Sequence, residues 1–226
     1  MKKIKNFPFI KMEKLTRDEL FSLALYLDLP NLLKFCQTSK TIDRNVCKND
    51  NFWIHKIVNE YPQYQNDFKD KNPREKYFLI YNLLILKKKL NKDNQIITED
   101  IVDLYNRKTL DLSYINLVSI PEQLGNLTNL QTLYLDNNML TSIPEQLSNL
   151  TNLQRLSLPY NKLTSIPEQL GNLTNLQTLI LDNNNLTSIP EQLSNLTNLQ
   201  TLILDNNNLT SIPEEIKRIP GITIYR

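Results

Sequence analysis

The side chains that could perform chemistry are few in this chain of 226 residues, and they stand far apart. His55 is the only histidine and lies two positions from Trp53 on a predicted helix, where we expect it to be packed or solvated. Cys36 and Cys47 lack the C-x-x-C spacing of a zinc site. With three glycines in all, the chain has no glycine-rich phosphate loop. We therefore expect no enzyme activity, no metal and no cofactor.

Composition excludes several classes of partner. The net charge of +2 gives no strong attraction to nucleic acid. No continuous apolar stretch follows the basic residues 1–5, and the apolar residues 77–86 are too few to span a bilayer. The two cysteines lie in an apolar helical stretch, so we expect reduced thiols, as in a cytoplasmic or nuclear protein. We expect neither a membrane nor a nucleic-acid partner.

A 23-residue repeat fills the C-terminal half. Its copies, of which the first is a variant and the last partial, begin at Leu117, Leu140, Leu163, Leu186 and Leu209. The third and fourth copies differ only at Gly171 and Ser194. Each copy can bury its apolar face only against its neighbours, so the period predicts a solenoid. The repeated residues are aliphatic, amide and hydroxyl types, which favours a binding surface over a catalytic one.

Within each copy, residues such as 130–140 follow the pattern L-x-x-L-x-L-x-x-N-x-L. Leu133 and Leu135 are two apart, so they share the core face of a short strand, while Tyr134 between them faces solvent. An asparagine follows where the chain turns, and its amide can satisfy buried backbone donors and acceptors. A structural ladder is expected at Asn138, Asn161, Asn184 and Asn207.

This spacing resembles the 23-residue leucine-rich repeat common in intracellular proteins, from about residue 107 to the C-terminus. The resemblance implies an α+β solenoid with short parallel strands on its concave side. We call the outward-pointing side of these strands the strand face. In the atypical coil that precedes these copies, Ile115 stands where the ladder asparagine is expected, and we interpret that coil as a cap, because terminal repeats are often atypical.

The N-terminal segment predicts four short helices instead. Thr16 and Glu19 have the spacing of a capping box that begins the first helix. Asp28 and Pro30 signal the start of the second. Ser39 and Asp50 are the predicted caps of the third and fourth.

This run resembles an F-box, with Thr16 where that family usually has proline. The matching framework is a set of leucines and a late tryptophan: Leu15, Leu20, Leu23, Leu27, Leu32, Leu33 and Trp53. The resemblance implies that these residues bind the adaptor Skp1. The alternative is a small helical cap that covers the open edge of the solenoid.

An F-box followed by leucine-rich repeats resembles the substrate receptor of a Skp1–cullin–F-box ubiquitin ligase, with a protein target on the repeats. The alternative is a recognition scaffold without a ligase role. The abundant Asn, Lys and Ile and the near-identical repeats are also similar to F-box repeat proteins of large DNA viruses, although AT-rich cellular genomes give the same bias.

We predict an F-box-like domain over residues 1–72, a helical linker and cap over 73–106, and the repeats over 107–226. The linker begins with an amphipathic helix over residues 73–90, and residues 98–100 start another helix that packs on the first coil. Together they would make a rigid bridge.

The strand face is where a target should bind, because outward positions align from coil to coil. Tyr and Arg are favoured hot-spot residues, and the neighbouring aspartates favour a basic partner. The predicted target-binding residues are Tyr114, Tyr134, Asp136, Arg155, Ser157, Tyr160, Ile180, Asp182, Ile203 and Asp205.

Overall fold

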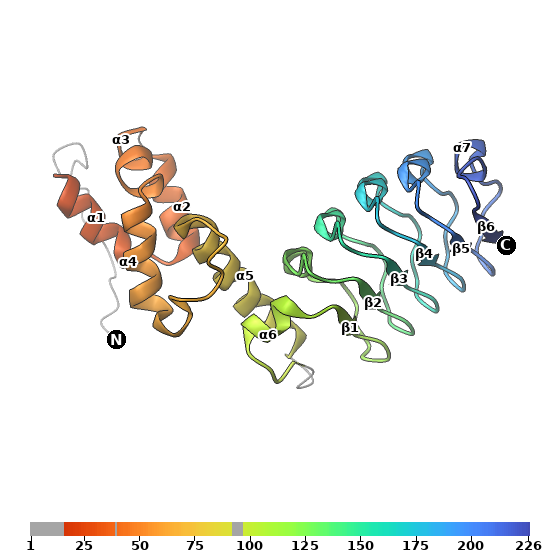
Figure 1. Ribbon diagram of the computed structural model, residues 1–226, viewed down its shortest axis with the longest axis horizontal. Coiled ribbons are helices and arrows are strands. Elements are labelled where there is room, and N and C mark those ends of the chain that lie inside the picture. Colours follow the sequence, from red (N-terminus) through yellow and green to blue (C-terminus); the bar gives the residue numbers. More distant parts are fainter. Residues whose placement is uncertain (1–15, 39, 92–96) are drawn as a thin grey trace. The chain divides into compact units, whose positions relative to one another are not determined.

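The computed structural model describes residues 16–38, 40–91 and 97–226 (Figure 1). Its contacts form two compact units, Met1–Ile80 and Tyr81–Arg226, which we call the helical unit and the repeat unit. The division falls inside α5 (Pro73–Leu90), so one continuous helix begins in the helical unit and ends in the repeat unit. Leu15 and Ser39, from the F-box framework and the predicted third cap, lie outside the described residues.

The helical unit is built from short helical segments, of which α1, α2 and α4 have side-chain caps. They are α1 (Arg17–Leu25), α2 (Leu29–Gln37), α3 (Lys40–Ile42), the π-helical turn η2 (Asp43–Cys47), α4 (Asp50–Glu60), the 3₁₀ turn η3 (Pro62–Tyr64) and the start of α5. Thr16 and Glu19 form the predicted capping box, and Asp28 Oδ1 accepts from the amide of Asn31 at 3.0 Å. The predicted cap of the fourth helix was wrong by one residue, because Asn49 Oδ1 accepts from the amide of Asn51 and Asp50 is already helical.

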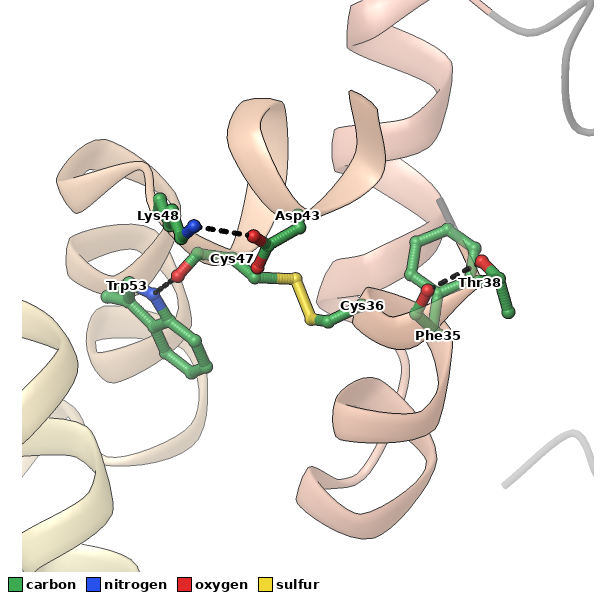
Figure 2. Close-up of a disulfide and its surroundings, with 7 residues drawn as sticks. All are labelled: Phe35, Cys36, Thr38, Asp43, Cys47, Lys48 and Trp53. Carbon is green, nitrogen blue, oxygen red and sulfur yellow. Dashed lines mark hydrogen bonds and ion pairs between the residues drawn. A yellow bond between two sulfur atoms is a disulfide. The ribbon is translucent and has the colours of Figure 1, made fainter. Parts of the chain in front are cut away.

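The two cysteines form a disulfide, which corrects the expectation of reduced thiols. The π-helical turn η2 carries Cys47 to the end of α2, where its Cα lies 6.0 Å from that of Cys36 (Figure 2). This separation is ordinary for a disulfide. Beside the bridge, Trp53 Nε1 donates to the Cys47 carbonyl at 2.9 Å, so the bridge and the indole hold the same turn.

The repeat unit is a stack of coils, and the predicted solenoid with short parallel strands is confirmed. Its strands are β1 (Thr109–Asp111), β2 (Thr132–Tyr134), β3 (Arg155–Ser157), β4 (Thr178–Ile180), β5 (Thr201–Ile203) and β6 (Thr223–Tyr225). They form one parallel sheet in chain order. Each strand pairs with the next in the same register, so Leu133 lies opposite Leu156 and Leu156 opposite Leu179.

A short helical segment returns the chain on the other side of each coil (Figure 1). These segments are η4 (Glu122–Asn126), η5 (Glu145–Asn149), η6 (Glu168–Asn172), η7 (Glu191–Asn195) and α7 (Glu214–Lys217). A proline with a φ between −69° and −51° precedes each one. Between strands and helical segments, leucines such as Leu170, Leu173 and Leu179 are fully buried.

The first coil is covered by α6 (Ile101–Asn106). Asp100 caps this helix by accepting from the amide of Val102 at 3.0 Å, and Ile101 and Leu104 are buried. Asn129 Nδ2 in the first turn of the stack donates to the Tyr105 carbonyl at 3.1 Å. The predicted helix after residues 98–100 therefore does pack on the first coil.

Two glycines allow the helical segments of neighbouring coils to approach one another closely. A Cβ on Gly125 would lie 2.2 Å from the Gln146 carbonyl oxygen of the next coil, and one on Gly171 would lie 2.3 Å from that of Gln192. The corresponding positions of the intervening coils are Ser148 and Ser194, which carry a Cβ. Neighbouring coils therefore alternate between a contact that admits only glycine and one that admits a side chain.

This alternation predicts that placing alanine at equivalent positions of two nearly identical coils has unequal costs. Gly171→Ala should lower the free energy of unfolding by about 1–3 kcal/mol, because the new methyl meets backbone and not a flexible side chain. Ser194→Ala, which keeps the existing Cβ, should change it by less than about 0.5 kcal/mol. Urea denaturation of the full chain measures both, and equal effects would contradict the close contact at Gly171.

Candidate functional site

The asparagine ladder fixes the edge of the strand face. Asn161 Oδ1 accepts from the amide of Leu140 in the preceding coil at 3.0 Å. Its Nδ2 donates to the Leu135 carbonyl of the preceding coil and to the Leu158 carbonyl of its own, at 3.0 and 3.1 Å. Asn138, Asn184 and Asn207 make the equivalent bonds. Each ladder residue therefore ties its coil to the one before it.

The first coil has no ladder residue of its own, and its backbone amides bond to the ladder residue of the next coil. The amides of Ile115 and Leu117 both donate to Asn138 Oδ1, at 3.3 and 2.8 Å. A ladder asparagine bonds with its side-chain amide to backbone groups of the preceding coil. No coil precedes this one, so the apolar Ile115 is tolerated at the ladder position. The predicted cap role of this coil agrees with that arrangement.

The sheet register aligns outward side chains into columns on the strand face. One column is Asp111, Tyr134, Ser157, Ile180, Ile203 and Tyr225. The neighbouring column is Thr109, Thr132, Arg155, Thr178, Thr201 and Thr223. Tyr225 extends the first column and was missed as a site residue, although its place at the end of a final strand was visible in the sequence.

The predicted target-binding residues differ in accessibility. Tyr134, Asp136, Arg155, Ile180, Asp182, Ile203 and Asp205 are half-buried. Ser157 is only 2% exposed, so it forms the floor between its neighbours and its hydroxyl offers little surface to a partner. Tyr114 and Tyr160 are the most exposed members of the set, at 75% and 56%.

Charge on the strand face is mostly negative. Asp111, Asp136, Asp182 and Asp205 lie on the outward columns or the turns beside them, against the single guanidinium of Arg155. Asp136 Oδ1 and Arg155 Nε are both buried and have no hydrogen-bond partner among the described residues. Buried polar groups are usually satisfied. These two atoms are therefore exceptions among the buried polar atoms of the described residues.

The turn after each of β1 to β5 holds a residue in the left-handed backbone region at an equivalent position. The φ of this residue is +62° at Tyr114, +52° at Asn137, +54° at Tyr160, and +54° at both Asn183 and Asn206, and the first turn holds a second such residue, Asn116, at +57°. Asparagine enters this region readily, whereas a bulky side chain there is an outlier. Tyr114 and Tyr160 therefore occupy positions at which asparagine would cost less.

The predicted adaptor-binding residues fall into two groups. Leu20, Leu32 and Trp53 are buried in the core of the helical unit. These three residues pack in the core, and their contact with an adaptor stays a prediction. Leu23, Leu27 and Leu33 are half-buried and retain surface for a partner.

A polar network inside the helical unit was missed. Lys56 is 0% exposed, and its Nζ donates to the Leu25 and Leu27 carbonyls at 3.1 and 2.7 Å and pairs with Glu60. Tyr77 Oη donates to Glu60 Oε2 at 2.6 Å. Burial is the main cause that raises the pKa of Tyr77 well above its usual range, and the Glu60 carboxylate is the second cause. The network ties the end of α1 to α4 and α5, and i, i+4 spacing of Lys56 and Glu60 was its only sequence signal.

The described residues show no other chemical centre. His55 is exposed, with its ring 5.8 Å from that of Phe21. No group of three or more metal-ligating side chains occurs among them. None of the helices in the described ranges is both long and apolar enough to cross a membrane.

Comparison with known proteins bears on the repeats. The family described as "Leucine-rich repeat region" matches residues 65–205, and "Leucine Rich Repeat" matches 198–219. No curated protein matches the chain.

Similar solved structures include a leucine-rich repeat protein of Leptospira interrogans at 34% identity, over 58% of this chain and 40% of that one, with a TM-score of 0.46. Internalin C2 of Listeria monocytogenes is 34% identical over 54% of this chain and 53% of that one, with a TM-score of 0.48. The BIR3–SERK2 complex of Arabidopsis thaliana gives 42% identity over 51% and 65%, with a TM-score of 0.45. The chain thus spans less than two thirds of each of these proteins. Since the first family match alone covers more than half of its residues, the chain belongs to the leucine-rich repeat family.

Proposed function

We propose that this chain is a recognition subunit that binds a protein target on its strand face. Leucine-rich repeat proteins typically mediate protein–protein interaction. The observation that carries the proposal is the pair Tyr114 and Tyr160, which are exposed and held with positive φ where other coils have asparagine. Backbone strain of this kind clusters at functional positions. Exposed tyrosine is also a common hot-spot residue.

The chemistry of the strand face selects the target. Carboxylates outnumber guanidinium groups four to one on and beside the outward columns, so a basic segment is the complementary partner. Tyr134, Tyr160 and Tyr225 offer ring faces to lysine or arginine.

We further propose that the helical unit is an F-box that docks onto a Skp1-type adaptor of a cullin ubiquitin ligase. The support is the leucine and tryptophan framework and the Thr16 capping box, which starts α1 without the usual proline. Such a subunit would act in the cytoplasm or nucleus and would need no active site of its own. The alternative is a repeat scaffold whose N-terminal helices have no ligase role.

The tyrosine positions predict a trade between stability and binding. Tyr160→Asn should raise the free energy of unfolding by about 1 kcal/mol, because asparagine tolerates the left-handed region better. The same variant should bind a labelled nona-arginine probe about tenfold more weakly, as expected for loss of a hot-spot residue. Denaturation and fluorescence polarisation of the full chain measure the two effects.

The reciprocal change serves as the matched control. Asn183→Tyr has the same φ to satisfy and should destabilise the chain by a similar amount. If Tyr160→Asn left both stability and probe binding unchanged, the functional interpretation of the strained tyrosines would be wrong.

Adaptor binding separates the two roles of the helical unit. The full chain should capture purified Skp1, and Leu33→Asp, at a half-buried position of α2, should weaken that capture about tenfold without unfolding the protein. Lys34→Ala at the exposed neighbouring position is the control, and circular dichroism checks the fold. Absence of capture by the folded wild-type chain would favour the scaffold alternative.

A further inference from the structure

A second surface with binding potential lies in the helical unit. A pocket of about 280 Å³ opens between α4 and the chain that joins η3 to α5. Ile54 and Val58 of α4 line it and are 46% and 44% exposed, although both are large aliphatic residues. They stand four apart, so they share one helix face. Phe68 lines the pocket from the joining segment.

Phe68 is held in an unusual conformation. Its φ is +50°, in the left-handed region, and its ring is buried. A bulky residue keeps such a φ only where the surrounding structure requires it. The ring therefore gives the pocket a fixed apolar wall.

The charged lining of the pocket has one sign. Lys69, Lys71 and Lys76 line it, and no carboxylate does. Lys71 pairs with Asp70 at 3.0 Å, and Lys76 Nζ donates to the Gln65 carbonyl at 2.7 Å. Lys69 is exposed and makes no ion pair with any described residue. The pocket thus combines an apolar wall with a cationic rim.

Three surrounding features shift the pKa of Lys76. Burial lowers the pKa of Lys76, Asp67 partly offsets this, and the neighbouring Lys69 lowers it further. A carboxylate brought into the rim would favour the charged ammonium form and relieve the repulsion between the two lysines.

We propose that this pocket binds a short acidic segment of a partner protein, with one large apolar side chain against Ile54, Val58 and Phe68 and carboxylates on the lysine rim. Ligand pockets usually have volumes of about 300–1,000 Å³, and this pocket lies near the lower end of that range. A pocket of this size suits one or two side chains. Residues 1–15 of the chain itself carry five lysines and one glutamate, so their charge does not fit this rim.

This site is independent of the proposed target site. The strand face is acidic and belongs to the repeat unit, whereas the pocket is cationic and lies wholly within the helical unit. It would remain if the helical unit proved to have no ligase role.

Fluorescence polarisation of the full chain with a labelled peptide Asp-Glu-Phe-Leu-Glu-Asp tests the proposal. We expect saturable binding that weakens as salt rises, since Lys69 of the rim is solvent-exposed. Two control peptides replace the acids by Lys and Arg, or Phe-Leu by Ala-Ala, and both should bind at least about tenfold more weakly. No binding of the acidic peptide, or equal binding of either control, would overturn the proposal.

Matched variants locate the site. Lys69→Glu combined with Lys71→Glu, and separately Ile54→Asp, should each weaken binding at least about tenfold. Lys34→Glu and Tyr26→Asp place the same changes at exposed positions outside the pocket and should stay within about twofold of wild type. If Ile54→Asp unfolds the chain, the milder Ile54→Ser takes its place. Equal losses at pocket and control positions would also overturn the proposal.

Discussion

Each coil of the repeat unit must turn out of its strand inside the protein, and this buried turn is the constraint on which the rest depends. A buried backbone donor or acceptor without a partner costs about 1–3 kcal/mol. Asn161 meets this need for two coils at once, since its Oδ1 accepts from Leu140 and its Nδ2 donates to carbonyls of both coils. The same bonds lock each coil to the previous one in a single register. Columns on the strand face are a direct consequence of that register.

The repeat unit could be predicted from the sequence because its contacts are local and periodic. Leu133 and Leu135 define the core face by their spacing alone, and the recurring asparagine marks the turn. The accessibility of particular outward residues could not be predicted in the same way. Ser157 is a small side chain between Tyr134 and Ile180, and its burial depends on the size of its neighbours in the column.

The helical unit was predicted less well because its contacts depend on tertiary structure. Nothing near Cys36 in the sequence indicates that a π-helical turn brings Cys47 to it. The role of Lys56 depends on carbonyls about thirty positions earlier, which no spacing rule reveals. The framework leucines were recognised, but an apolar pattern does not distinguish core residues such as Leu32 from partner contacts such as those proposed for Leu33.

Two surfaces of opposite charge follow from this combination of units, an acidic strand face and a lysine-rimmed pocket.

Amide hydrogen exchange, measured by NMR on the full chain, tests the central role of the ladder most directly. The amides of Leu117, Leu140, Leu163 and Leu186 are the ones that donate to ladder Oδ1 atoms. If the ladder holds the coils together, these four amides should exchange only when the repeat unit unfolds, with the same free energy of opening as the strand amides. Exchange as fast as that of an exposed turn would show that the ladder bonds break locally, and would contradict the account.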